Sequence, residues 1–145
     1  MDTKTILLIE DNLDDEQLIL ISLKQSNIGN AVVIARDGQE ALDLLFGNAA
    51  APGRELSHLP VVVLLDLHLP KVDGLEVLKR IRADARTEFL PIVILTSSKE
   101  EKDRIGSYSL GANSYVCKPV DFGEFADAVK KLGLYWVLIN TPARD

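Results

Sequence analysis

Only one of the 145 residues is a cysteine, and aromatic residues make up 6% of the chain. A lone cysteine, Cys117, excludes an internal disulfide and fits a reducing compartment, so we expect a cytoplasmic protein. The first apolar run covers only residues 6–9 and does not resemble a signal peptide. No stretch approaches the ~20 apolar residues that a membrane-spanning helix needs. Secreted and membrane proteins are therefore not expected.

Positive charge is also in short supply, with 16 Lys and Arg against 22 Asp and Glu, for a net charge of −6. Direct nucleic-acid binding requires a basic surface and is not expected. The acidic balance suits a protein that holds a cation or meets a basic partner. Hydrophobic content of 47% is ordinary for a globular protein, and the length predicts a single domain over residues 1–145.

Five short apolar runs predict five buried strands, at residues 6–9, 31–35, 61–65, 92–95 and 114–117. Helical patterns alternate with them, starting near Asn12, Asp37, Asp73, Lys99 and Asp121. Strands and helices that alternate at this spacing imply right-handed crossovers and a parallel sheet. We therefore predict a doubly wound α/β domain in three layers, with five strands and five helices.

The spacing of apolar residues in the predicted helices indicates which side chains are buried and which are exposed. In the first helix, which runs up to Ser26, an apolar stripe is predicted from Leu18, Ile19, Ile21 and Leu23. The third helix is predicted to have Leu75, Val77, Leu78 and Ile81 inside, and Lys79, Arg80 and Arg82 on a solvated face. Residues 47–60 form a long connection, for which a flexible insertion is preferred to a recognition loop.

Polar groups follow four of the five strands. In a parallel sheet the carboxyl ends of the strands meet at one edge, so these side chains are expected to lie together. Three adjacent carboxylates repel one another unless a divalent cation compensates, and hard oxygen ligands suit Mg²⁺, with Mn²⁺ as an alternative. The set consists of Glu10, Asp11, Asp66, Thr96 and Lys118.

A metal ion, a lysine and a hydroxyl around one carboxylate describe a phosphoryl-transfer site. In this interpretation Asp66 is the nucleophile and becomes an acyl phosphate. Lys118 holds the anion beside the cation, and Thr96 supplies a hydroxyl donor. Taken alone, Asp66 is also explained as a polar residue that ends a strand and starts a turn.

With these motifs the chain resembles a response-regulator receiver domain of bacterial two-component signalling. The matching segments span about residues 4–130 and occur in the family's order. They are residues 8–12 (LIEDN), 35–42 (ARDGQEAL), 65–70 (LDLHLP) with Asp73-Gly74, 95–97 (LTS) and 115–119 (YVCKP). The resemblance implies a flavodoxin-like sheet of order 2-1-3-4-5. It also implies that the chain is not an enzyme, apart from its own phosphorylation and dephosphorylation.

The resemblance implies a role for each matching residue. Asp66 would accept a phosphoryl group from a sensor histidine kinase. Asp11, Asp66 and the backbone carbonyl of His68 would bind Mg²⁺, and Glu10 would reach it mainly through water. Lys118 would bind the phosphoryl oxygens. Thr96 and Tyr115 would form the switch pair that reshapes the face made by the fourth helix, fifth strand and fifth helix.

The end of the chain extends beyond an ordinary receiver. A tail at about residues 133–145 and the long connection resemble stand-alone regulators that partner phytochrome-type, light-sensing kinases. That resemblance implies a homodimer through an apolar patch made by Leu134, Tyr135 and Leu138; the alternative is that the tail folds back over its own domain. No output module is expected, so signalling would proceed by docking to a downstream protein or by transfer to a phosphotransfer histidine.

Two other functions remain open at this point. An Asp-nucleophile phosphatase also places its aspartate after a parallel strand, but it carries a second acidic residue two positions later, where this chain has His68. The other alternative is a degenerate receiver used only as a scaffold. The side chain of His68 is expected to be variable surface, and Cys117 is expected to pack in its strand rather than to sense redox state.

Overall fold

The computed structural model describes residues 5–25, 28–50, 53, 55–96, 111–118 and 123. Five strands form one sheet in the order β2-β1-β3-β4-β5, and every neighbouring pair is parallel. The strands are β1 (Thr5–Ile9), β2 (Ala31–Ala35), β3 (Val62–Asp66), β4 (Ile92–Thr96) and β5 (Ser114–Cys117). This order confirms the flavodoxin-like fold that was predicted.

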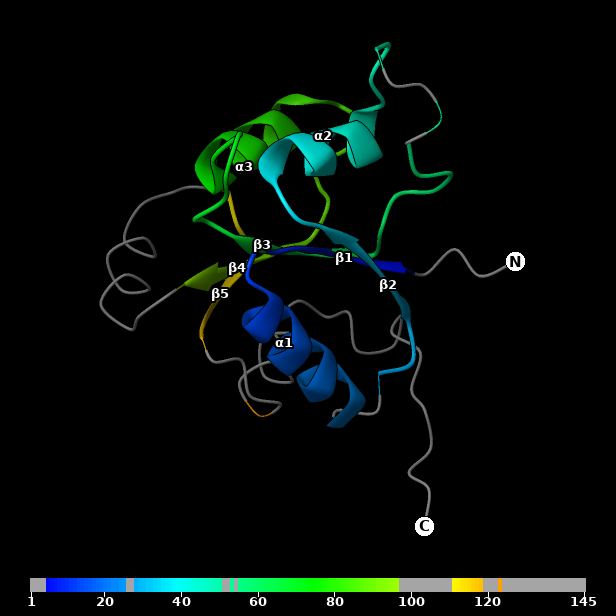
Figure 1. Cartoon of the computed structure of the whole chain (residues 1–145). Helices are drawn as coiled ribbons and strands as arrows, with labels where there is room; N and C mark the ends of the chain where they lie inside the picture. Colours follow the sequence, from blue (N-terminus) through cyan, green and yellow to red (C-terminus); the bar gives the residue numbers. More distant parts are fainter. Residues whose placement is uncertain are drawn as a thin grey trace.

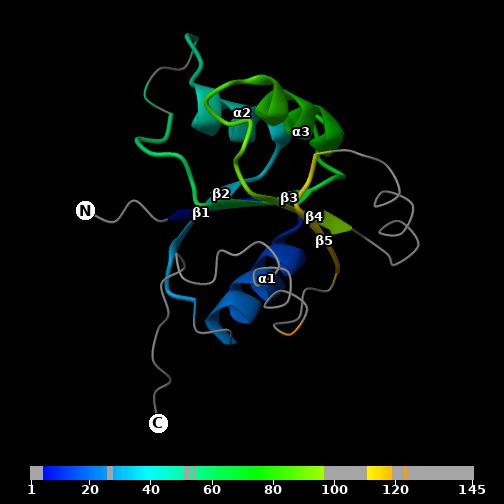
Figure 2. The same cartoon turned by 180° about the vertical axis from the view of Figure 1, so that it is seen from behind.

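Helices lie on both sides of the sheet (Figure 1). Helix α1 (Leu13–Gln25) covers one side, and α2 (Gly38–Phe46) and α3 (Gly74–Ala83) cover the other, as the view from behind also shows (Figure 2). Alternate residues of each strand supply the two cores: Leu7 packs toward α2 and α3, and Leu8 packs toward α1. The three-layer arrangement is thus explained by strands that are apolar on both faces.

The described helices begin where the sequence offers capping side chains. Asp37 Oδ1 accepts a hydrogen bond of 2.7 Å from the backbone N–H of Glu40, and Asp73 caps α3 in a similar way. None of these helices has the length and apolar character needed to cross a bilayer. The predicted helices at 99–110 and from Asp121, and the tail, lie outside the described residues.

Two predicted helical faces are partly wrong. Leu75 is 39% exposed, because it lies about a third of a turn away from the buried side of α3. In α1, Ile19 and Leu23 are buried, whereas Leu18 and Ile21 are exposed. Four apolar residues at positions 18, 19, 21 and 23 spread around too much of a helix to share one face.

Arg82 is not simply solvated, as was predicted for its helix face. Its guanidinium donates hydrogen bonds to the carbonyl oxygens of Leu90 and Gly111, at 2.7 and 2.6 Å, and to Asn113 Oδ1 at 3.0 Å. Asn113 Oδ1 also accepts from the backbone N–H of Ile92 at 2.8 Å. Arg82 therefore ties the end of α3 to the starts of β4 and β5.

The connection between α2 and β3 contacts α2 in its described part. The backbone N–H of Leu56 donates to the carbonyl of Leu44 at 2.8 Å, and Asn48 Nδ2 donates to Asp43 Oδ1 at 3.0 Å. The flexibility of this connection stays a prediction.

Candidate functional site

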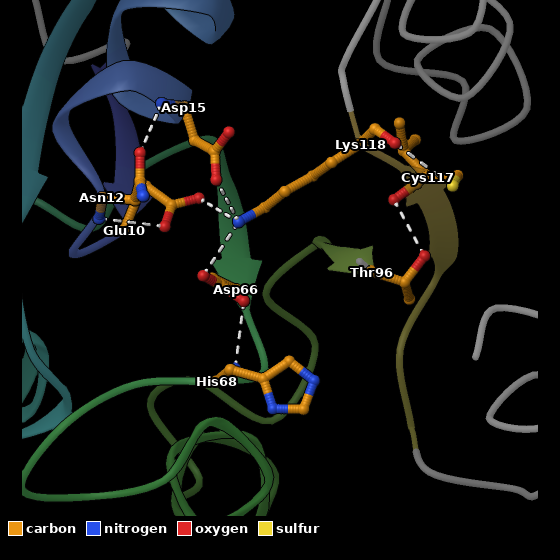
Figure 3. A network of polar contacts seen from close by, with 9 residues as sticks. Glu10, Asn12, Asp15, Asp66, His68, Thr96, Cys117 and Lys118 are labelled. Atoms are coloured by element: carbon orange, nitrogen blue, oxygen red, sulfur yellow. Dashed lines mark hydrogen bonds and ion pairs between the residues drawn. The ribbon is translucent and has the colours of Figure 1, made fainter. Parts of the chain in front are cut away.

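The carboxyl ends of the parallel strands bring the predicted side chains to one edge of the sheet (Figure 3). Asp66 is the last residue of β3, and Thr96 is the last residue of β4. Glu10 follows β1, and Lys118 follows β5. Four segments that lie far apart in the chain thus meet at one place.

Lys118 is the centre of this cluster. Its ammonium lies 2.7 Å from Glu10 Oε1, 3.0 Å from Asp66 Oδ2 and 3.0 Å from Asp15 Oδ2. Its backbone N–H donates to the carbonyl of Thr96 at 2.8 Å, which fixes the residue beside the end of β4. Burial acts to lower the pKa of Lys118, but the three carboxylates outweigh it and raise that pKa above its usual value. The lysine therefore stays charged.

Glu10 is the most deeply buried carboxylate of the site, with an exposed fraction of 0%. Burial and the neighbouring Asp66 raise its pKa to about 7, although Lys118 acts in the opposite direction. Glu10 Oε2 accepts a hydrogen bond of 3.3 Å from the backbone N–H of Asn12. Glu10 Oε1 is paired with Lys118 by charge but lacks a partner with hydrogen-bond geometry. A second cation beside Glu10 and Asp66 would offset the repulsion between these two carboxylates, which Lys118 alone does not cancel.

Three carboxylates offer oxygens to such a cation. Oxygen atoms of Glu10, Asp11 and Asp66 all lie within 4.8 Å of one another. Asp11 is exposed, so the site opens to solvent on that side. Mg²⁺ and Mn²⁺ prefer carboxylate oxygens and room for water, and Glu10 Oε1, which accepts no hydrogen bond, can serve as one such ligand. The donor set is thus suited to a divalent metal ion.

The loop after β3 also holds Asp66. The backbone N–H of His68 donates to Asp66 Oδ1 at 3.0 Å, and the His68 residue itself is exposed. Exposure of His68 agrees with the prediction that its side chain is part of the surface.

The two predicted switch residues lie on adjacent strands. Thr96 is fully buried, and its hydroxyl is 3.4 Å from the carbonyl of Val116. Tyr115 is half-buried against the core under α2 and α3, and burial raises its pKa. Cys117 is half-buried in β5, with its thiol 3.4 Å from the carbonyl of Lys118. The predicted dimer residues Leu134, Tyr135 and Leu138 lie outside the described residues.

Asp15 is the site residue that the sequence did not reveal. It lies in the first turn of a helix and not at a strand end, yet it contacts Lys118. The sequence feature that could have identified Asp15 is its position in the first turn of the helix that follows Glu10 and Asp11. Such a residue lies at the same edge of the sheet as the strand ends.

The raised pKa of Glu10 predicts a pH dependence for the metal-free domain. A carboxyl whose pKa rises on folding, from 4.5 to about 7, stabilises the fold at low pH, and this contribution is lost as pH rises through that range. Relative to Glu10→Gln, wild type should lose roughly 3 kcal/mol of unfolding free energy between pH 4.5 and 7.5. Urea unfolding at a series of pH values measures this difference. Mg²⁺ should reduce the loss, whereas two parallel pH profiles would contradict the assignment.

Comparison with known proteins agrees with this geometry. Residues 6–130 match the family model described as the response regulator receiver domain. Response regulator Rcp1 of Synechocystis sp. is 37% identical over 97% of this chain and 94% of its own length. A probable methanogenesis regulatory protein, FilR2 of Methanothrix harundinacea, is 39% identical over 91% of this chain and 83% of its own.

Solved structures extend the comparison to the fold. The bacteriophytochrome response regulator AtBRR superposes with a TM-score of 0.84 at 47% identity, covering 97% of this chain and 99% of its own. An Mn²⁺-bound form of Rcp1 superposes with a TM-score of 0.69 at 36% identity, covering 97% of this chain and 99% of its own. The family match covers most of the sequence and includes every residue of the acidic site. The chain therefore belongs to the response regulator receiver domain family of two-component signalling proteins.

Proposed function

We propose that Asp66 is the phosphoacceptor of this receiver domain. The observation that carries the proposal is the position of Asp66, whose two oxygens are held by the Lys118 ammonium and the His68 backbone N–H, both at 3.0 Å. The same carboxylate belongs to the acidic trio that suits a divalent cation. The proposed nucleophile thus lies next to a positive charge and forms part of the proposed metal site.

The reaction is a transfer between two proteins. One oxygen of the Asp66 carboxylate attacks the phosphorus of a phosphohistidine on a sensor kinase. The new P–O bond forms as the P–N bond breaks, and the departing imidazole nitrogen keeps the electron pair and takes up a proton. Mg²⁺ held by Glu10, Asp11 and Asp66, with the carbonyl of His68, would supply positive charge beside the phosphoryl oxygens.

Lys118 and Thr96 then bind the phosphoryl group on Asp66. Lys118 holds a phosphoryl oxygen, and Thr96 turns its hydroxyl from the Val116 carbonyl toward the phosphoryl group. Tyr115, which is half-buried, follows into the space that Thr96 leaves. The result is a shift between two packings around β5, which a partner protein recognises.

The cognate kinase is proposed to be of the phytochrome type. Support comes from AtBRR and from a second bacteriophytochrome regulator, RtBRR, which is 46% identical to this chain. A cytoplasmic location fits the single cysteine. The phosphoryl signal would pass to a downstream protein or to a phosphotransfer histidine.

The test uses acetyl phosphate, a small phosphodonor, and intact-protein mass spectrometry. Wild type should gain one phosphoryl group in the presence of Mg²⁺ and none in the presence of a chelator. A folded protein that binds Mg²⁺ but gains no phosphoryl group would instead favour the scaffold alternative. Continuous release of phosphate from unrelated phosphoesters would favour the phosphatase.

The homodimer is proposed from the sequence of the tail, through Leu134, Tyr135 and Leu138. Leu138→Asp should turn a dimer into a monomer, because a charge in an apolar interface loses its water without gaining a partner. Light scattering measures the mass directly. Lys130→Asp, which also adds negative charge near the end of the chain, should leave the dimer intact. An unchanged mass for Leu138→Asp would remove the tail from the interface.

A further inference from the structure

Three carboxylates crowd the Lys118 ammonium in the described structure. It donates hydrogen bonds to Asp15 and Asp66, each at 3.0 Å, and is paired by charge with Glu10 at 2.7 Å (Figure 3). The Lys118 side chain is only 14% exposed, so water contributes little. A phosphoryl oxygen that approaches this ammonium must therefore compete with carboxylates that already surround it.

The three partners differ in how readily they give way. Glu10 is fully buried, so its carboxylate would lose its counter-charge without gaining water. Asp66 is 5% exposed in its side chain and is the proposed attachment point itself. Asp15 has a side chain that is 30% exposed, so water can replace the lysine there. The contact with Asp15 is the one that opens at the lowest cost.

We propose that Asp15 is a positioning residue that competes with the phosphoryl group for Lys118. This inference rests on the proposed role of Asp66. In the resting domain Asp15 holds the ammonium toward the first turn of α1. When one oxygen of Asp66 carries a phosphoryl group, Lys118 turns to that group and Asp15 becomes solvated. Loss of the Asp15 charge therefore favours the phosphorylated arrangement.

Two other roles for Asp15 predict different results. As an acidic residue in the first turn of α1, it also favours the helix dipole, and its N–H donates to Asn12 Oδ1 at 2.9 Å. That role is shared by Asp14, its exposed neighbour in the same turn. As a metal ligand, Asp15 would join Glu10, Asp11 and Asp66, but it is absent from the described carboxylates that come within 4.8 Å of one another.

The test measures the affinity for beryllofluoride, which mimics a phosphoryl group on aspartate, by calorimetry at saturating Mg²⁺. Asp15→Asn should bind it about threefold or more tightly than wild type, because a neutral amide competes less well for the ammonium. Asp14→Asn removes the same charge from the same helix turn and should bind it as wild type does. Asp15→Glu, which restores the charge, should return the affinity toward that of wild type.

A second measurement separates competition from metal binding. The Mg²⁺ affinities of Asp15→Asn and Asp14→Asn should agree within about twofold, since both lose one charge near the site. A much weaker Mg²⁺ affinity in Asp15→Asn alone would make Asp15 a metal ligand and overturn the inference. Equal beryllofluoride affinities in Asp15→Asn and wild type would overturn it too. If wild type accepts neither beryllofluoride nor a phosphoryl group, the proposed function fails first.

Discussion

Asp66→Asn is expected to abolish phosphoryl uptake while the domain stays folded. The amide keeps the size of the carboxylate and keeps an oxygen for the His68 N–H, but it cannot form an acyl phosphate. Lys118 retains Glu10 and Asp15 as partners. The measurement is the intact mass after incubation with acetyl phosphate and Mg²⁺. The expected result is no added phosphoryl group.

The same substitution should leave the metal-free domain at least as stable as wild type. Asp66 raises the pKa of Glu10, so removing its charge relieves repulsion inside the cluster. The gain in unfolding free energy at pH 7 should be about 1 kcal/mol, measured by urea unfolding without metal. Asp14→Asn is the matched control and should take up the phosphoryl group normally. Phosphoryl uptake at the wild-type level by Asp66→Asn would place the acceptor on another residue.

Gly74→Ala is expected to be the most damaging small substitution at the site. Gly74 begins α3, and an added Cβ would lie 2.5 Å from Leu67 Cα and 2.6 Å from the carbonyl oxygen of Asp66. These are backbone atoms, so no side chain can move aside to relieve the overlap. The free energy of unfolding should fall by roughly 3 kcal/mol, measured by urea unfolding.

Gly74→Ala should also weaken metal binding. The loop that Gly74 touches runs directly into Asp66 and His68, and the Gly74 N–H donates to the Leu67 carbonyl at 3.1 Å. A shift of this backbone would misplace Asp66, so the Mg²⁺ affinity of the folded fraction should also fall. Gly53→Ala is the control: no atom of the described structure lies within 4 Å of its added Cβ, and only its φ of +91° opposes the change. Equal losses in the two variants would contradict the proposed overlap.

The sheet and the strand-end cluster could be predicted because both depend on local sequence. Short apolar runs such as 61–65 have one consistent explanation, which is burial on both faces. A parallel sheet then brings the residues after each run to the same edge, so Asp66, Thr96 and Lys118 needed no further information to be grouped. The conditions for this success are a regular topology and short, unambiguous strands.

Other features depend on contacts between distant residues, which periodicity does not describe. Arg82 was predicted to be one of several solvated basic residues on a helix, but its guanidinium donates a hydrogen bond to a carbonyl group 29 residues away. Asp15 is one of several acidic residues in the first turn of α1, but its lysine partner lies 103 residues further along the chain. Leu75 was predicted to be buried because it is apolar. In the structure its neighbour Gly74, which has no side chain, lies against the backbone of Asp66 and Leu67 at the end of β3. Side-chain reach and backbone crowding decided these cases.

The crowded lysine has a consequence for the cell that contains this protein. Three acidic residues pair with one ammonium, and Asp11 lies beside two of them, so the resting site keeps a surplus of negative charge. An incoming phosphate donor is repelled by that surplus until a cation has bound. With Mg²⁺ as that cation, the fraction of molecules able to accept a phosphoryl group would depend on the free Mg²⁺ concentration as well as on the proposed kinase. The concentration of divalent cations would thus change how much of the protein becomes phosphorylated at a given level of stimulus.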